Sequence, residues 1–294
     1  MSPDPTAIQF AKRASTSNDE DEEDDDDDTP KKKKPAGPNW LLIVGGGCGF
    51  LTLLLCVGGG FLGYYLYSKG KEAVGNIQAE MKNIGGKVET RNNLMQIGLA
   101  MHGSHDRNKA LPSHAIMDFK TNQPLLSWRV QILEDLNEGA LFNQIRRNEP
   151  WDSAHNKQFW NKIPKAYQMP GKPVDGNTYY QAFVGKGSAF PKANGPGMGP
   201  DRVTLVGITD GSSNTIFVVE AANPVNWMKP DDIPFEASPK GVPLSAVGNH
   251  WGDDSFFAVM GDGSVRRFPR ATTTPQMLQS AITRAGGEIV ALPD

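Results

Sequence analysis

Cysteine is almost absent from this 294-residue chain, which contains only Cys48 and Cys56, both within one apolar segment. The residues after that segment therefore hold neither a disulfide framework nor a thiolate metal site. Excess positive charge is also absent: the net charge is −3, and ten consecutive acidic residues occupy 19–28. Without that run the remainder is only mildly basic, which argues against a nucleic-acid surface. We expect no nucleic-acid partner.

Charge is missing altogether between Lys34 and Lys69, where Trp40–Tyr67 reads WLLIVGGGCGFLTLLLCVGGGFLGYYLY. A helix rises about 1.5 Å per residue, so about 20 residues cross a hydrocarbon core about 30 Å thick. Tryptophan at one end and tyrosines at the other suit the two interfaces. The sequence predicts one transmembrane helix at 39–68 with the lipid bilayer as its partner. A buried core helix and a cleaved signal peptide are the alternatives.

The lysines that flank this segment predict its orientation. Lys31–Lys34 precede it directly, and positive charge stays on the cytoplasmic side. The lysines on the far side are more widely spaced. We therefore expect a cytoplasmic N-terminus and an extracytoplasmic domain at 69–294. The tail, residues 1–38, has few large apolar side chains and opposite charge blocks, which predicts disorder.

Glycine is frequent in the apolar segment. Gly45 and Gly49 form one pair at a four-residue spacing, and Gly59 and Gly63 form another. Such pairs let two membrane helices approach closely, so we consider self-association through these four glycines. The alternative is that glycine is simply tolerated in a membrane helix.

Residues 71–106 follow a helical pattern. Their apolar stripe comprises Val74, Ile77, Met81, Ile84 and Val88 and continues through Met95 and Leu99, more weakly through Leu94 and Met101. The spacing predicts a stalk that continues as a core helix. The pair Gly85-Gly86 is expected to weaken or kink it.

The rest of the chain predicts an α+β fold with long loops. A second helix is expected over Ser127–Ile145, capped by Ser127, and a last helix over Pro275–Arg284. Between them, short β-rich runs predict an antiparallel sheet. These runs are Thr178–Val184, Val203–Ile208, Thr215–Glu220, Ser255–Met260 and Ser264–Phe268.

Five segments together carry a family resemblance, in this order: RNNLMQIGLAMH (91–102), LSWRVQIL (126–133), EPWDSAHNK (149–157), ITDGSSNTIFVVEA (208–221) and GDGSVRRF (261–268). Over about residues 72–290 the chain resembles a prepilin-like family of unknown function that is abundant in planctomycetes and is also filed as solute-binding. The resemblance implies a pilin-like fold, in which a long N-terminal helix packs on an antiparallel sheet.

The chain departs from that family's pattern at two places. Members typically carry a leader whose processing site is followed, five residues into the apolar helix, by a glutamate, whereas Gly49–Val57 contains no acidic residue. We therefore expect no leader-peptidase processing. Members also end with a histidine followed after nine residues by Asp-Gly. Here eleven residues separate His250 from Asp262-Gly263.

The C-terminal signature supplies the candidate site. His250, Asp253, Asp262 and Gly263 could bind a ligand or metal, or they could shape a tight hairpin turn. We favour the turn, because Asp followed by Gly commonly forms one.

Other patterns for chemistry are weak. His102 and His105 could hold zinc only with a third ligand such as Asp106 or His114, and we favour a role at the end of the helix. The glycine-rich segments match neither a P-loop nor a dinucleotide fingerprint, and GxSxG is absent. We expect no catalytic residue, cofactor or metal.

The sequence favours a membrane-anchored, non-enzymatic surface or periplasmic domain with a structural or interaction role. The alternative is an extracytoplasmic protein that binds a solute or a carbohydrate, since five tryptophans follow the apolar segment. A hydrolase with an unrecognised site is the third hypothesis.

Overall fold

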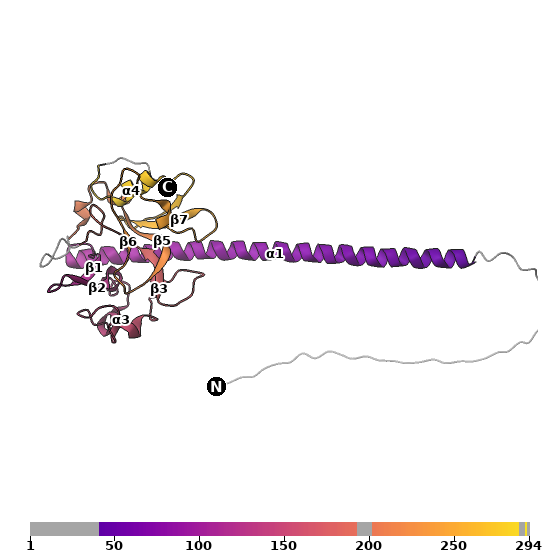
Figure 1. The fold of residues 1–294 in the computed structure, drawn as a ribbon, viewed down its shortest axis with the longest axis horizontal. Helices are drawn as coiled ribbons and strands as arrows, with labels where there is room; N and C mark the ends of the chain where they lie inside the picture. The colour runs from indigo at the N-terminus through magenta and orange to yellow at the C-terminus, as the bar shows by residue number, and fades with distance from the viewer. Residues whose placement is uncertain (1–40, 193–201, 288–291, 293–294) are drawn as a thin grey trace, which may run out of the picture. The chain divides into compact units, whose positions relative to one another are not determined.

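The computed structural model describes residues 41–192, 202–287 and 292, with side chains described from residue 59 onward (Figure 1). The chain divides into two compact units, Met1–Tyr67 and Ser68–Asp294. The second unit combines helices with a mainly antiparallel sheet, which confirms the α+β class. The predicted disordered tail, residues 1–38, lies outside the described residues.

The first helix, α1 (Leu41–Asn108), confirms the helix predicted over 71–106. The sequence predicts a weak point at Gly85-Gly86, but α1 is continuous through both residues. A Cβ atom on Gly86 would collide with the ring of Trp251, whereas a Cβ on Gly85 would meet nothing within 4 Å. Gly86 therefore provides the space into which an aromatic ring from the C-terminal part of the chain packs.

The buried face of α1 differs from most of the predicted apolar stripe. The stripe residues are 45–66% exposed: Val74, Ile77, Met81, Ile84, Val88, Met95 and Leu99. Leu94 and Met101, the weaker members of the predicted stripe, are fully buried together with Ile97, on the side that carries Gly86. The prediction of a stalk that continues as a core helix is confirmed, but the main residues of the stripe do not form the buried surface, because a second apolar face of α1 packs on the domain.

In the part of the chain whose residues are described, no helix is both long and apolar enough to cross a membrane. Trp40 lies outside the described residues, and so do the side chains of 41–58, which form most of the uncharged segment.

The helix predicted over Ser127–Ile145 is two short helices, α2 (Trp128–Gln131) and α3 (Gly139–Gln144). Ser127 caps α2 as predicted, since its hydroxyl accepts a hydrogen bond from the N–H of Arg129. Asn137 adopts a φ of 61°, a left-handed conformation that a continuous right-handed helix cannot contain. The predicted single helix is therefore wrong.

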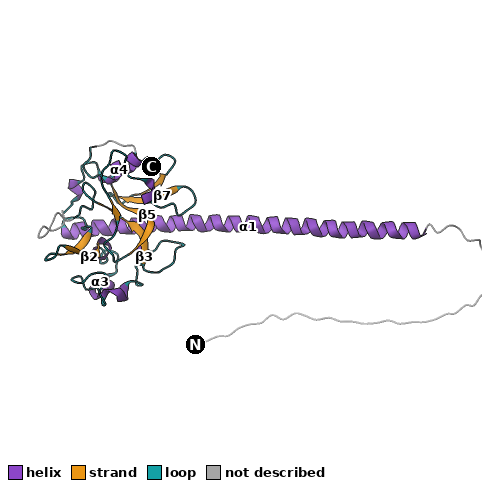
Figure 2. Ribbon diagram, viewed as in Figure 1, coloured by secondary structure: helices purple, strands orange, loops and turns teal. Residues whose placement is uncertain are grey.

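The central sheet has four antiparallel strands in the order β3-β5-β7-β8 (Figure 2). They are β3 (Asn177–Gln181), β5 (Ile216–Asn226), β7 (Ser255–Met260) and β8 (Val265–Pro269). Four of the five predicted strands are confirmed by these elements. The fifth, Val203–Ile208, is wrong. It contains a single 3-10 turn (Leu205–Gly207), because the Thr204 hydroxyl accepts the N–H of Gly207.

Two smaller strand pairs were not expected from the sequence. A hairpin joins β1 (Ala115–Asp118) to β2 (Gln123–Ser127). A short parallel pair joins β4 (Phe183–Val184) to β6 (Ile233–Pro234). The parallel pair places the loops that follow β4 and β6 next to each other.

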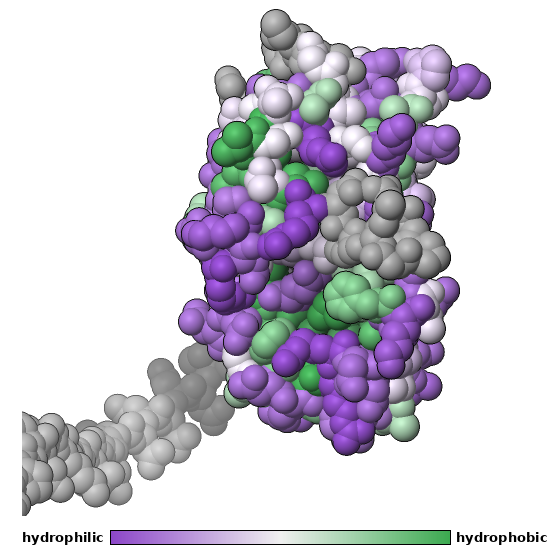
Figure 3. All heavy atoms as spheres, turned by 90° about the vertical axis from the view of Figure 1, so that its left-hand side faces the viewer, coloured by the Kyte–Doolittle hydropathy of each residue, from purple (hydrophilic) through white to green (hydrophobic). Residues whose placement is uncertain are grey.

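Both faces of the central sheet are covered. On one face Phe257 and Val259 pack in a cluster with Leu94, Ile97 and Met101 of α1. On the other face Phe256 and Met260 pack with residues of α4 (Pro275–Ile282), whose N-terminus is capped by Thr274. Strand β7 is consequently buried along its whole length. The face shown in Figure 3 is mainly hydrophilic, with hydrophobic residues in smaller patches between the hydrophilic ones.

The contact between Gly86 and Trp251 leads to a matched prediction. Gly86→Ala should lower the free energy of unfolding by about 1–3 kcal/mol, because the added methyl overpacks the indole. Gly85→Ala should raise it by about 0.5–1 kcal/mol, because alanine favours a helix and meets open space there. Equilibrium unfolding in urea measures both. Equal effects of the two substitutions would contradict the packing described.

Candidate functional site

The residues that the sequence groups as a candidate site lie at opposite ends of β7. His250 and Asp253 precede this strand, and Asp262 and Gly263 follow it. A six-residue strand spans roughly 17 Å or more. The structure therefore does not bring the four residues into one constellation.

Asp262 and Gly263 build the turn between β7 and β8. The backbone N–H and the hydroxyl of Ser264 donate to Asp262 Oδ1 at 2.9 and 2.7 Å. Gly263 has a φ of 85° and donates its N–H to the carbonyl oxygen of Met260 at 3.0 Å. Burial opposes ionisation of Asp262, but the hydrogen bonds from Ser264 and the charge of Arg266 hold its pKa below the ordinary value. These contacts are those of a tight turn.

Asp253 connects α1 to β8. Its Oδ2 lies 2.7 Å from Lys87 Nζ and 3.0 Å from Arg267 Nη2, and its Oδ1 accepts from the Ser255 hydroxyl at 2.8 Å. Burial opposes ionisation, but the hydrogen bonds from Lys87 and Ser255 with the nearby cationic charges lower its pKa. Asp253 is thus an ionised carboxylate in a cross-link between elements.

His250 packs against β3 and β5. Its Nε2 lies 2.9 Å from the carbonyl oxygen of Ala221, and its ring meets that of Tyr179 edge-on at 4.7 Å between centroids. Burial lowers the pKa of His250, which favours the neutral imidazole that donates to Ala221. The hydrogen bond to Ala221 and the ring contact with Tyr179 both join His250 to the central sheet of the domain.

The main ionisable group that sequence reasoning missed is Glu220 of β5. It is 0% exposed, and each carboxyl oxygen accepts one hydrogen bond: Oε1 from Trp251 Nε1 at 2.8 Å and Oε2 from the Phe257 N–H at 2.7 Å. Burial raises its pKa to about 7, although both hydrogen bonds oppose the rise. The signal in the sequence was a single acid within the apolar run IFVVEA.

A second buried polar cluster fixes the segment before β6. Asp232 accepts hydrogen bonds from Arg129 Nη2 at 2.7 Å, from the Ala182 N–H at 2.9 Å and from Trp128 Nε1 at 3.1 Å. Burial raises the pKa of Asp232, and Arg129 with these N–H donors opposes the rise. Arg129 also donates to the carbonyl oxygen of Tyr180 in β3. The pair thereby joins α2, β3 and the start of β6.

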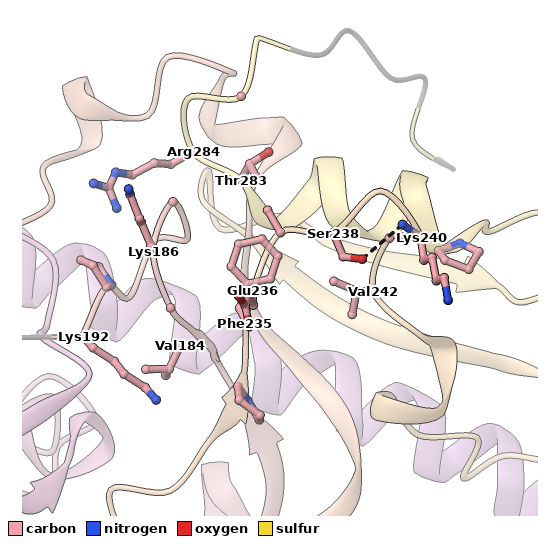
Figure 4. Close-up of a pocket in the computed structure, with 18 of the residues that line it drawn as sticks. Val184, Lys186, Lys192, Phe235, Glu236, Ser238, Lys240, Val242, Thr283 and Arg284 are labelled. Carbon is pink, nitrogen blue, oxygen red and sulfur yellow. Dashed lines mark hydrogen bonds between the residues drawn. The ribbon is translucent and has the colours of Figure 1, made fainter.

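A cavity of about 1520 Å³ opens beside the β4–β6 pair (Figure 4). Its wall is formed by the loops that follow β4 and β6 together with the segment after α4. Apolar lining comes from Val184, Phe235 and Val242, which are buried. The charged lining residues are four cations and one acid: Lys186, Lys192, Lys240, Arg284 and Glu236.

The cavity's rim is built into the fold. The N–H of Phe235 donates to the carbonyl oxygen of Val184 at 2.9 Å. The opposite side is tied to α4, because Gln279 Oε1 accepts from the Ser238 N–H at 2.8 Å and the Pro275 carbonyl accepts from Val242 at 3.0 Å. Gly241 has a φ of 74° and lies so close to Pro275 that a side chain would collide with it.

Positive charge is in excess around this cavity over the described residues. None of the salt bridges found there involves its three lysines, Arg284 or Glu236. Arg284 donates to the carbonyl oxygen of Ser188 at 2.5 Å. The lysines are exposed at the rim. A positive cleft with an apolar floor suits an anionic ligand.

The histidines of α1 do not assemble a metal centre. His105 Nε2 accepts the N–H of Leu205 at 3.4 Å, and the ring of His102 faces that of Phe217 at 6.5 Å between centroids. In the described part of the chain, no group of three or more His, Cys, Asp or Glu side chains could hold a metal ion.

The fold and the cavity together define a class: an α+β domain in which one long N-terminal helix packs on a mainly antiparallel sheet beside a basic cleft. The chain belongs to the family described as a protein of unknown function (DUF1559), whose model matches residues 87–243 and which also carries a solute-binding label. This match confirms the resemblance in the sequence. It covers the β4–β6 pair and ends before His250. Comparisons with curated proteins and with solved structures found no match.

Proposed function

We propose that this chain is a membrane-anchored, non-enzymatic binding protein whose extracytoplasmic domain takes up an anionic solute in the basic cavity. The observation that carries the proposal is the combination of four cationic side chains, one acid and an apolar floor around a preformed hollow. Ligand sites are typically concave and apolar, with a few polar groups that set specificity. The family's solute-binding label supports the same reading.

The size of the cavity favours an extended ligand. At about 1520 Å³ it exceeds the range of roughly 300–1,000 Å³ typical of sites for small molecules. Its cations come from three separate segments, with Lys186 and Lys192 after β4, Lys240 after β6 and Arg284 after α4. A ligand with several spaced carboxylates would contact all three segments. An acidic oligosaccharide has this chemistry.

The membrane anchor is the second part of the proposal. The support is the uncharged stretch between Lys34 and Lys69, long enough to span a bilayer as a helix, together with α1, which covers it from Leu41 onward. Lys31–Lys34 favour a cytoplasmic N-terminus. In the same membrane, Gly45, Gly49, Gly59 and Gly63 would permit close helix–helix contact.

A structural role is the second candidate function. The observation that favours it is the long helix α1 packed on the four-stranded sheet β3-β5-β7-β8, an arrangement expected of a pilin-like domain. In this role the domain would act as a building block of a surface assembly and the cavity would be incidental. The binding experiment below separates the two candidates.

Binding of an acidic oligosaccharide tests the cavity. With oligogalacturonate at about 100 times its dissociation constant, the domain should gain about 2.7 kcal/mol of stability, measured as a thermal shift. The double variant Lys186→Gln, Lys240→Gln should bind at least about tenfold more weakly, and added salt should weaken binding by the parent. Lys120→Gln, an exposed lysine in the β1–β2 turn, is the control. Equal shifts in parent and double variant, or none in the parent, would refute the proposal.

Extraction of membranes tests the anchor. Full-length protein should remain in the pellet after washing with alkaline carbonate, because an apolar helix stays in the bilayer. Protease added outside intact cells should degrade residues after Lys69 and spare the tail. Release of the full-length chain by carbonate would contradict the anchor, and digestion of the tail would contradict the orientation.

A further inference from the structure

An exposed apolar stripe runs along α1 in the second unit. Every residue from Lys69 to Gly85 is exposed, so the domain of the same chain does not cover this part of α1. Within it and just beyond, Val74, Ile77, Met81, Ile84 and Val88 are each more than half exposed. Soluble surfaces rarely leave a continuous row of large apolar side chains open to water unless it contacts a partner.

The spacing of the stripe identifies the kind of partner. Its five consecutive members are separated by three, four, three and four residues, which is the a/d repeat of a heptad. This period of 3.5 residues keeps a seam facing a second helix that follows the same repeat. After Val88 the next d position is Arg91, which ends the uninterrupted apolar row, and the next a position is Met95. From Val74 to Leu99 the stripe is about 40 Å long.

The stripe lies on the side of α1 opposite to the one that the domain occupies. Successive residues turn by about 100°, so Val88 and Met95 point away from Gly86, Asn93 and Ile97. Val88 and Met95 are exposed, whereas the three residues on the side of Gly86 are buried. A second helix can therefore lie along the stripe without displacing the sheet or Trp251.

We propose that two copies of this chain pair through the stripe Val74–Leu99 in a parallel coiled coil. A heptad seam needs a partner helix with the same repeat, and a second copy supplies it residue for residue. The parallel direction rests on the proposed anchor, because the α1 helices of two copies anchored in one membrane extend from that membrane in the same direction. Val74 and Val88 then occupy a positions, Ile77 and Ile84 occupy d positions, and the two domains lie on the outside of the pair.

Disulfide cross-linking tests this pairing at single positions. The chain's only cysteines, Cys48 and Cys56, are replaced by serine, and one cysteine is added to the full-length protein in its membrane. Ile77→Cys and Ile84→Cys should both form covalent dimers under mild oxidation, because identical d positions face each other in a parallel coil. Ala79→Cys, which is exposed on the side away from the seam, is the matched control and should give at least about tenfold less dimer.

Three outcomes would overturn the inference. Equal dimer yields at all three positions indicate random collision, and dimers at only one seam position indicate an antiparallel arrangement. Absence of dimers at both seam positions indicates that the stripe faces lipid or another protein. Carbonate extraction of the same samples distinguishes failure of the pairing from failure of the anchor. A chain that stays in the pellet but does not cross-link contradicts the pairing alone. A chain that cross-links but is extracted by carbonate contradicts the anchor alone.

Sedimentation of the full-length protein in detergent gives a second readout. The parent should have the mass of a dimer, and Met81→Glu should have the mass of a monomer with the domain's thermal midpoint unchanged, since Met81 does not pack on the domain. Lys82→Glu, a neighbouring exposed residue outside the seam, should remain dimeric. A monomeric parent, or dimeric Met81→Glu, would contradict the pairing.

Discussion

The buried carboxyl of Glu220 connects three elements of this domain: strand β5, strand β7 and the long helix α1. From β5 it accepts the N–H of Phe257 in β7 and the indole N–H of Trp251, and the indole fills the space beside Gly86 in α1. One side chain thus joins two strands and positions the ring that packs the long helix on the sheet. A buried polar group is tolerated when its hydrogen bonds are satisfied and is costly otherwise.

The functional surfaces follow from this packing. Because α1 covers one face of the sheet and α4 the other, the chain between them is left to form loops at the β4–β6 edge. Asp232 and Arg129 fix the start of β6, and α4 ties down the loop that follows it. The basic cavity forms there, away from Glu220. Since α1 buries only the side that carries Gly86, its heptad stripe stays open for a second copy.

Local signals in the sequence were sufficient for much of the fold. The Asp262-Gly263 turn, the flanking strands and the last helix depend on neighbouring residues, so their patterns identified them. The buried face of α1 was found only in part, at Leu94 and Met101, because the helix carries two apolar faces and only tertiary packing selects between them. The single helix predicted across Asn137 failed for a local reason, its left-handed backbone. The cavity could not be predicted from the sequence, because its cations come from three segments far apart in the chain.

The most direct test of the role of Glu220 is the dependence of stability on pH. Its pKa is about 7 in the folded domain and 4.5 ordinarily, so the folded state holds the proton more tightly. The stabilisation that protonated Glu220 gives the folded state is complete below pH 4.5 and is lost as the pH rises through 7. Its full contribution to the free energy of unfolding is on the order of 3 kcal/mol. The free energy of unfolding of the parent, minus that of Glu220→Gln, should therefore fall by about this amount between pH 4.5 and pH 8. A difference that stays constant over this range would contradict a buried, proton-holding Glu220 at the centre of the fold.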